Sequence, residues 1–162
     1  MRASAHVHTR YGDGKDSPEA MILRAMEKGF TALGFSEHGH LDFDPENCMS
    51  REAERAYRRE IAFLKDKYAG QIQIRLGVER DEFGLSEREH YEYVIGSKHY
   101  FRRGDDFFAV DNNPQTMRAG IDRFFGGEGL KLAVAYYEAF AAYVASYKPD
   151  IIAHFDLLTK FN

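Results

Sequence analysis

Cysteine, long apolar runs and an excess of positive charge are scarce or absent in this sequence. Its 162 residues include one cysteine, Cys48, so no disulfide can form within the chain, and we expect a reducing compartment. No apolar run approaches the roughly 20 residues that a membrane-spanning helix needs. Acidic residues outnumber basic ones by 26 to 22, which argues against a protein that binds nucleic acid through bulk positive charge.

The sequence also has no recognisable leader segment, internal repeat, low-complexity tract or linker. Met1 is followed by a charged residue and then by the segment with the first histidines, where a signal peptide would have an apolar segment. We therefore expect a cytoplasmic protein with no membrane partner. Hydrophobic residues make up 44% of the chain, which is typical of a globular protein. The length suits one domain with a substantial core, so we predict a single domain over residues 1–162.

Segments with strand character alternate with segments with helix character along the chain. The predicted strands cover residues 3–8, 30–36, 71–79, 93–99 and 150–154. The predicted helices run from Pro18 to Gly29 with Ser17 as the N-cap, from about Ser50 to Tyr68, over 115–125 within a polar excursion, and from about Leu130 to Tyr147. Strands separated by helices favour an α/β fold with parallel strands.

Histidines and one glutamate fall at the ends of the predicted strands. His6 and His8 are two residues apart on the first strand, so both imidazoles point to the same face. The later strands end in His38, Glu79, His99 and His154. Because the carboxyl ends of strands in a parallel barrel meet at one mouth, we expect these side chains to form one site. Imidazoles with carboxylates suit divalent metals, here two or three ions of Zn, Mn or Fe.

Four further polar residues give weaker evidence of a role in the site. Asp13 fits either a turn in Tyr-Gly-Asp-Gly or a place in the metal shell. Glu37 would point away from His38 on a strand, so we expect a structural carboxylate or one that supports a ligand. His40 could face metal, substrate or solvent. His90 lies in a charged run and is expected to be an ordinary surface residue.

Taken together, these segments resemble the PHP (polymerase and histidinol phosphatase) family, and within it the histidinol-phosphate phosphatases. The resemblance covers nearly the whole chain, with its motifs in the family's order. Lys98 departs from the pattern, because a small apolar residue is more usual there. The similar segments are His6-Val7-His8-Thr9, Ser36-Glu37-His38, Gly77-Val78-Glu79, Gly96-Ser97-Lys98-His99-Tyr100 and Ala153-His154-Phe155-Asp156-Leu157, followed by Thr159-Lys160-Phe161-Asn162.

The resemblance implies a distorted, TIM-like (βα)7 barrel with a trinuclear metal centre. About five parallel strands are present, so we expect an incomplete barrel, truncated at its C-terminus. The family's later Asp-x-His motif, which supplies two more ligands, is not in these 162 residues. An open sheet exposes an edge strand, so we expect self-association through that edge. A light-scattering mass equal to that of a compact monomer would contradict this expectation.

The reaction implied by the resemblance is hydrolysis of L-histidinol phosphate to histidinol and phosphate, a step of histidine biosynthesis. A metal-bridged hydroxide would attack phosphorus, with Glu79 bridging the ions and His38 near the substrate, so these two residues are the expected catalytic ones. The residues expected to bind the substrate are His40, Lys98, Arg102 and Lys160. For Arg102, a solvated surface charge is the favoured alternative.

Two other functions stay open at this stage. One is a PHP phosphoesterase that acts on nucleotides or DNA ends. The other is a non-catalytic, metal-binding fragment. The segment Asp156–Asn162 and the lack of a basic stripe favour a small phosphorylated substrate over nucleic acid.

Overall fold

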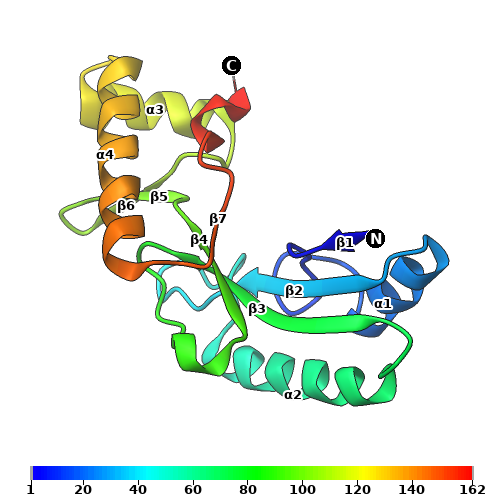
Figure 1. The fold of residues 1–162 in the computed structure, drawn as a ribbon. Coiled ribbons are helices and arrows are strands. Elements are labelled where there is room, and N and C mark those ends of the chain that lie inside the picture. Colours follow the sequence, from blue (N-terminus) through cyan, green and yellow to red (C-terminus); the bar gives the residue numbers. More distant parts are fainter. Residues whose placement is uncertain (1, 162) are drawn as a thin grey trace. The chain divides into compact units, whose positions relative to one another are not determined.

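A sheet of five strands is the central element in the computed structural model, which describes residues 2–161 (Figure 1). Its order is β1-β2-β3-β4-β7, where the strands are β1 (Ala3–Ser4), β2 (Ala32–His38), β3 (Gln73–Asp81), β4 (Tyr93–Ser97) and β7 (Ile151–Ile152). The chain divides into two compact units, Met1–Ile95 and Gly96–Asn162. Met1 and Asn162, the ends of the predicted domain, lie outside the described residues. The single-domain assignment stays a prediction.

The two helices of the first unit begin where the sequence predicts. Ser17 precedes α1 (Pro18–Glu27) and its side chain accepts a hydrogen bond from the backbone N–H of Ala20. Ser50 precedes α2 (Arg51–Lys67) and accepts from Ala53 in the same way. Each cap satisfies a backbone donor that has no partner inside its helix. Helix α2 runs alongside β3 (Figure 1).

Strand boundaries in the first unit differ from the predicted ones. β2 and β3 both begin and end two residues later than predicted, so His38 becomes the last residue of β2 and Glu79 lies two residues before the end of β3. β1 contains only Ala3 and Ser4, whereas the predicted strand ran over residues 3–8. The ladder is interrupted because the Tyr93 hydroxyl donates to the Ala5 carbonyl oxygen at 2.6 Å and lies 3.0 Å from that of Phe35.

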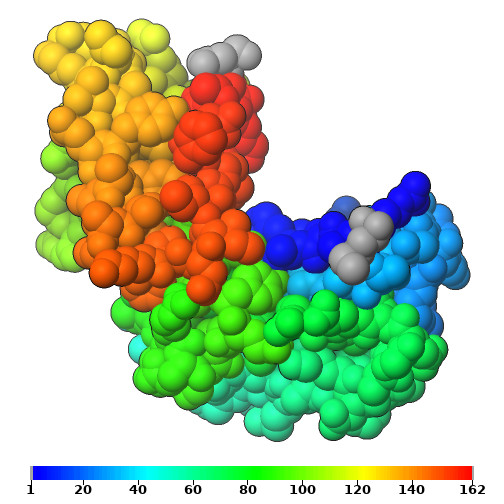
Figure 2. Space-filling model, in the orientation of Figure 1, coloured from blue at the N-terminus to red at the C-terminus, as the bar shows by residue number. Residues whose placement is uncertain are grey.

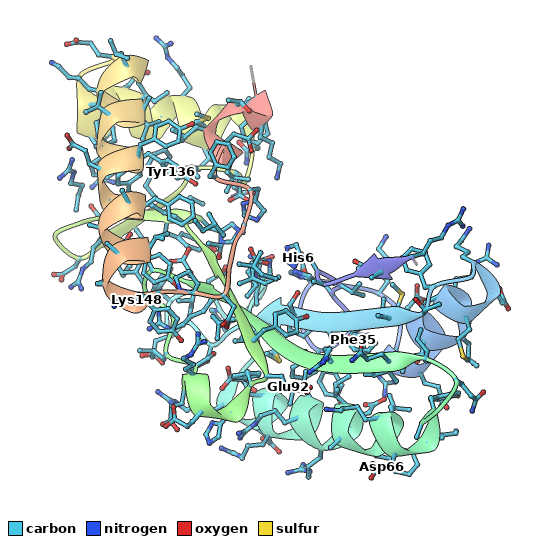
Figure 3. The ribbon with its side chains drawn as sticks, in the orientation of Figure 1. His6, Phe35, Asp66, Glu92, Tyr136 and Lys148 are labelled. Carbon is cyan, nitrogen blue, oxygen red and sulfur yellow. The ribbon has the colours of Figure 1, made fainter. Side chains whose placement is uncertain are left out.

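The partly buried ring of Tyr93 packs closely against glycines of two neighbouring strands in the first unit. A Cβ atom at Gly77 would lie 2.2 Å from the ring carbon Cζ, and one at Gly34 would lie 2.4 Å from the hydroxyl oxygen. Only glycine leaves room for the ring at these two positions. Phe35, labelled in Figure 3, is fully buried, and so is Tyr57, whose hydroxyl donates to the Gly77 carbonyl.

The second unit packs two helices and a hairpin around an aromatic core. The helices are α3 (Pro114–Phe125) and α4 (Gly129–Tyr147), both close to their predicted ranges. The hairpin strands β5 (Tyr100–Arg103) and β6 (Asp106–Ala109) were not predicted. The buried residues of this core are Phe101, Phe108, Val110, Phe125, Leu132, Tyr136, Phe140, Tyr143 and Leu158. Tyr136 is labelled in Figure 3.

Two further predicted strands, β4 and β7, are shorter than expected. β4 ends at Ser97 because the next two carbonyls bond elsewhere: that of Lys98 accepts from the Tyr136 hydroxyl, and that of His99 accepts from the Val110 N–H. β7 covers only Ile151–Ile152, although the Ala153 N–H still donates to the Gly96 carbonyl at 2.9 Å. Two 3₁₀ helices, η1 (Arg88–His90) and η2 (Leu157–Phe161), complete the elements in the described range.

Helix α4 has an exposed apolar side. Leu130 is 78% exposed, and Val134 and Tyr137 follow it at helical spacing with about half of their surface open. The helix is drawn in orange along the surface of the second unit in Figure 2. Neither α4 nor any other helix within residues 2–161 combines the length and apolar character needed to cross a membrane.

Candidate metal centre

The buried carboxylate of Glu79 is the centre of a cluster of histidines. β2 and β3 are parallel, and their register places His38, the last residue of β2, directly opposite Glu79 near the end of β3. Glu79 is 1% exposed. The Nδ1 atom of His38 lies 3.4 Å from Glu79 Oε2. The register of the sheet therefore brings together two candidate ligands that are 41 positions apart in the sequence.

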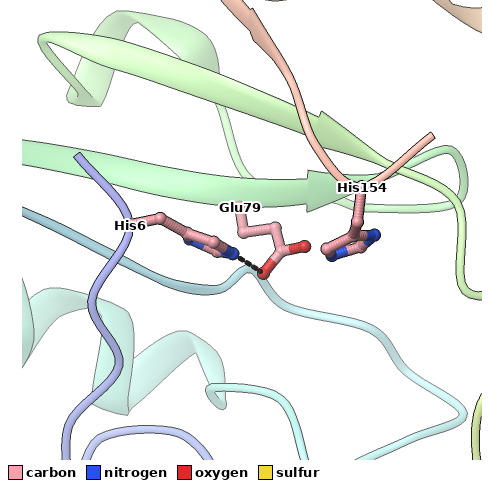
Figure 4. Close-up of side chains that lie close together, drawn as sticks. All are labelled: His6, Glu79 and His154. Atoms are coloured by element: carbon pink, nitrogen blue, oxygen red, sulfur yellow. Dashed lines mark ion pairs between the residues drawn. The ribbon is translucent and has the colours of Figure 1, made fainter. Parts of the chain in front are cut away.

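His6 and His8 approach the same carboxylate oxygen from the extended segment after β1. Their Nε2 atoms lie 3.4 Å and 3.1 Å from Glu79 Oε2. Figure 4 shows the ion pair between His6 and Glu79 as a dashed line. The backbone carbonyl of the intervening Val7 accepts a hydrogen bond from the Ser36 N–H at 3.0 Å. The predicted common direction of the two imidazoles is therefore present, although the residues lie beyond the strand.

The second ring nitrogen of each histidine is held by a polar side chain. His6 Nδ1 lies 2.7 Å from Ser36 Oγ, and His8 Nδ1 lies 2.8 Å from Asp13 Oδ1. Such hydrogen bonds fix the ring orientation and leave Nε2 directed at the centre. Ser36 was not predicted as a functional residue. Its position two residues before His38 on one strand was the available signal, since both side chains then leave the same face.

Asp13 joins two of the histidines from a loop. Besides its contact with His8, its Oδ2 atom lies 4.0 Å from His38 Nε2. Its side chain is 47% exposed, in contrast to the buried Glu79. The geometry places Asp13 at the edge of the cluster, next to two candidate ligands. Its role as a ligand stays a prediction.

The electrostatic surroundings of the cluster favour a cation. Burial by itself lowers the pKa of the His8 imidazole, but hydrogen bonds and charges from Glu79 and Asp13 outweigh burial and raise this pKa to about 9. Burial raises the pKa of the Glu37 carboxyl to about 7, against the hydrogen bonds from Thr9 and the charge of His8 that lower it. Glu79 and Asp13 thus stabilise positive charge at His8.

The donor set fits a divalent transition metal. One ligand atom each from His8, His38 and Glu79 all lie within 4.8 Å of one another. Two imidazole nitrogens and a carboxylate oxygen are ligands that zinc, manganese and iron accept. His6 presents a further nitrogen to the same carboxylate oxygen. These residues could therefore hold an ion without a rearrangement of the strands.

Glu37 lies on the side of β2 away from the histidines, as strand alternation predicts. It is fully buried, and its Oε1 atom accepts from both the backbone N–H and the hydroxyl of Thr9. The expected structural or supporting role is consistent with this geometry. Thr9 was not singled out from the sequence.

His40 is tied into its own loop. Its Nδ1 atom lies 2.9 Å from the Met49 carbonyl oxygen and its Nε2 atom 2.9 Å from Asp42 Oδ1. The structure does not bring the ring of His40 into the cluster at Glu79. His90 is exposed and pairs with Glu87, the residue that precedes η1, in keeping with its expected surface role.

The remaining candidates lie in the second unit. The rings of His99 and His154 are neighbours, with centroids 5.1 Å apart. Lys98 is 1% exposed, and its Nζ atom donates to the Tyr100 carbonyl at 3.0 Å. Arg102 and Lys160 are half exposed and donate to the carbonyls of Gly104 and Asp111, respectively. Their assignments to metal and substrate stay predictions.

Comparison with known sequences identifies related proteins. A model of the PHP domain matches residues 4–162. Histidinol-phosphatase from Bacillus subtilis (strain 168) is 26% identical over 182 aligned residues, which cover 99% of this chain and 68% of that protein. A protein from Deinococcus radiodurans named as a probable histidinol-phosphatase is 29% identical over 169 residues, covering 98% and 62%. The chain thus spans about two thirds of the length of these relatives.

Comparison with solved structures identifies the fold. The crystal structure of hisK from Listeria monocytogenes matches with a TM-score of 0.79 at 22% identity, over 99% of this chain and 69% of that one. This likeness, together with the parallel pairing of β1, β2 and β3, confirms the predicted α/β fold, a partial TIM-like barrel with about five parallel strands.

Proposed function

The chain belongs to the PHP domain family, and from this premise we propose that it is a metal-dependent phosphomonoesterase that hydrolyses L-histidinol phosphate to histidinol and phosphate. The reaction would serve histidine biosynthesis in the cytoplasm. Both curated relatives described above are named for this activity, which supports the choice of substrate. A nucleotide or a DNA end is the alternative substrate, and no contact of the described residues favours it.

One observation carries the proposal: three imidazoles converge on a single buried carboxylate oxygen. Glu79 Oε2 lies within 3.4 Å of nitrogens from His6, His8 and His38. A phosphate monoester resists hydrolysis strongly in water, so a catalyst must neutralise charge and provide a nucleophile. A cluster of imidazoles and carboxylates is suited to hold the ions that do both.

The residues of the chain have separate tasks in this proposal. When bound, divalent ions supply charge neutralisation at the phosphate and a nucleophile from water at neutral pH. Glu79 and the three histidines would hold these ions, while Ser36 and Asp13 keep the rings of His6 and His8 oriented. Two or three ions of Zn, Mn or Fe fit the donor set.

Release of inorganic phosphate tests the proposal directly. The purified chain is loaded with Zn²⁺ or Mn²⁺ and assayed with L-histidinol phosphate, nucleoside monophosphates and single-stranded DNA carrying a 3′ phosphate. We expect release from L-histidinol phosphate to exceed release from the other substrates. Preference for the nucleotide or DNA substrates would assign the alternative phosphoesterase function.

Elemental analysis of the same preparation gives the metal content. Two or three ions per chain are expected. Bound metal without release of phosphate from any substrate would indicate the non-catalytic fragment, and absence of bound metal would contradict the proposed centre.

A further inference from the structure

Glu37 is a buried carboxylate that the proposed chemistry does not use. The side chain leaves β2 on the face opposite to His38 and is fully buried. Its Oε1 atom accepts from Thr9 N at 2.7 Å and from Thr9 Oγ1 at 2.5 Å. A buried carboxylate is costly, so the contacts that it makes must be specific. Both of these contacts go to the residue that directly follows His8.

The loop after His8 folds back over this carboxylate. A Cβ atom at Gly12 would lie 2.8 Å from Glu37 Oε2, which shows how closely the backbone approaches the carboxylate. Within residues 2–161, no hydrogen-bond donor reaches this second oxygen. The Gly12 N–H donates to the Thr9 carbonyl at 3.1 Å, so the turn closes on the residue that Glu37 holds.

The two glycines of this loop flank Asp13. A Cβ atom at Gly14 would lie 2.6 Å from Thr9 N and 2.7 Å from the carbonyl carbon of His8, so Gly14 packs directly on the backbone at the start of the loop. Between the two close approaches, Asp13 reaches His8 Nδ1 at 2.8 Å. The position of Asp13 is therefore set by backbone packing around Thr9.

Burial in the loop is concentrated at one residue. Thr9 is fully buried, whereas every other residue from Arg10 to Gly14 is exposed or only partly buried. The side chain of Asp13 is itself about half exposed. An exposed loop residue keeps one geometry only if its backbone is fixed elsewhere. Two contacts attach this loop to the interior: the pair of hydrogen bonds from Thr9 to Glu37, and the Tyr11 hydroxyl, which donates to Glu60. Only the first lies directly beside His8.

We propose that Glu37 is a positioning residue that clamps the loop Thr9–Gly14 through Thr9 and thereby holds Asp13 in place beside His8 and His38. Glu37 touches neither the proposed ions nor the substrate in this role. It acts through Asp13, whose carboxylate orients His8 and borders the metal centre. The inference rests on the proposed function for its purpose, although it is tested without substrate.

Metal affinity of the full chain, measured by calorimetry with Mn²⁺ after removal of bound ions, is the first test. Glu37→Ala should weaken Mn²⁺ binding about 10- to 100-fold, the usual effect of losing a residue that supports metal ligands. Gly12→Ala should also weaken it, because the new Cβ displaces the loop from the carboxylate. Glu37→Gln keeps an oxygen acceptor for Thr9 and should retain most of the affinity.

A double variant separates positioning from a general loss of stability. If Glu37 acts through Asp13, Asp13→Ala removes the benefit, and Glu37→Ala should then weaken Mn²⁺ binding no further in that background. If the two substitutions weaken Mn²⁺ binding independently, so that their fold-losses of affinity multiply in the double variant, the proposal is wrong.

Glu92→Ala is the matched control for these measurements. Glu92 also accepts a backbone hydrogen bond, from Leu76 N at 2.7 Å, but it contacts none of the candidate ligands. The control should lower stability and leave Mn²⁺ affinity unchanged. An equal loss of affinity in Glu92→Ala and Glu37→Ala would mean that Glu37 is only structural.

Amide hydrogen exchange on the metal-free chain is the second test, and it does not depend on the proposed function. The N–H groups of Thr9 and Gly12 should exchange much faster in Glu37→Ala than in the parent chain, while the amides of α2 stay protected. If the exchange rates of these loop amides do not change, Glu37 does not hold the loop in place and the proposal is wrong. A parent chain that binds no Mn²⁺ would refute the proposed function, and the exchange result would still decide the role of Glu37.

Discussion

At the scale of single residues, the candidate centre depends on which histidines face Glu79. His8 is the most strongly tied of them, because one ring nitrogen lies 3.1 Å from Glu79 Oε2 and the other 2.8 Å from Asp13 Oδ1. His90 has the same side chain but is exposed and contacts only Glu87 among the ion pairs that the structure shows in the described residues. The two histidines therefore form a natural pair for comparison.

Replacing His8 should remove metal binding, whereas replacing His90 should not. We expect His8→Ala to lose at least one ion per chain and to lower phosphate release more than about 100-fold, since a ligand and its orientation are both removed. Elemental analysis and the phosphate assay measure the two effects. His90→Ala should match the parent chain in both. Full metal content and activity in His8→Ala would exclude His8 as a ligand.

The residue scale also shows what the sequence could and could not predict about the site. His6, His8, His38 and Glu79, which the structure brings together, could be proposed as ligands because their spacing and their positions near strand ends are visible in the sequence. The contact between Ser36 and His6 and the hydrogen bonds between Thr9 and Glu37 were not predicted. They depend on which side chains lie next to each other in the folded chain. The residue type identifies the candidate metal ligands. The hydrogen-bond partners of those ligands depend on the register of β2 with its neighbouring strands.

At the scale of elements, Glu92 links a strand to a helix through its carboxylate. It accepts from Leu76 N in β3 at 2.7 Å and from Lys65 Nζ in α2 at 2.8 Å. Burial raises the pKa of Glu92, but these hydrogen bonds and the charges of Lys65 and Arg75 outweigh burial, so the net effect lowers this pKa. A carboxyl with a lowered pKa stabilises the folded state when ionised.

The stability contributed by Glu92 should therefore disappear in acid. It is present above the unfolded pKa of about 4.3 and is lost as the pH falls through the lower pKa of the folded state. Glu92→Gln should reduce the free energy of unfolding by about 1 kcal/mol at pH 7 and by much less at pH 3. Urea unfolding at the two pH values measures this difference. Glu27→Gln, at an exposed pair with Arg24, should change little at either pH.

The ends of α3 and α4 offer a second prediction at this scale. Lys148 follows α4 with φ 56°, in the left-handed region, and its N–H donates to the Val144 carbonyl. Gly126 holds the corresponding position after α3 with φ 64°, and a Cβ atom added there would meet no atom within 4 Å. Both positions favour glycine for conformational reasons.

Exchanging the residue types at these two ends should give opposite results. Lys148→Gly should stabilise the chain by about 0.5–1 kcal/mol, because the left-handed penalty is relieved and is only partly offset by the greater freedom of unfolded glycine. Gly126→Ala should destabilise it by about 1 kcal/mol. Thermal unfolding of both variants gives the comparison. A shift of the same sign in the two variants would contradict the conformational explanation.

Element boundaries were predicted less well than the elements themselves. The start of α1 was located by the cap at Ser17, which is a local signal, and the start of α2 was predicted at about Ser50. The ends of β2 and β3 were placed two residues too early, because buried residues continue along both strands and mark no end. The hairpin of β5 and β6 was missed although Gly104-Asp105, a dipeptide that suits a two-residue turn, lies between its strands.

At the scale of the whole molecule, each unit has its own buried residues, and in the first unit the ring of Tyr93 packs against two neighbouring strands. The ring lies over the glycines of two neighbouring strands, and its hydroxyl interrupts the ladder of β1 just before His6. Burial raises the pKa of this hydroxyl well above the ordinary value, so it stays protonated and can donate. The packing of these strands and the start of the candidate metal centre thus share one side chain.

A methyl group at position 77 should disturb this arrangement strongly. Gly77→Ala would place Cβ 2.2 Å from the ring of Tyr93, and we expect a loss of about 2–3 kcal/mol in the free energy of unfolding. Denaturant unfolding measures it. Gly129→Ala, where the new Cβ meets no atom within 4 Å, should be neutral or slightly stabilising.

The same packing predicts a rescue. Tyr93→Leu in the Gly77→Ala background should cost less than the two single losses added together, because the smaller side chain leaves room for the new methyl group. Strict additivity would show that the ring and the glycine do not compete for the same space.

The contact between Tyr93 and its two glycines also constrains how the sequence can diverge. A side chain can be gained at position 34 or 77 only after, or together with, the loss of the aromatic ring at position 93. Related chains should therefore fall into two groups, one with glycine at 34 and 77 beneath a tyrosine, and one with larger residues there and a small residue at 93. The volume of the Tyr93 ring therefore determines the order in which these substitutions can occur during evolution.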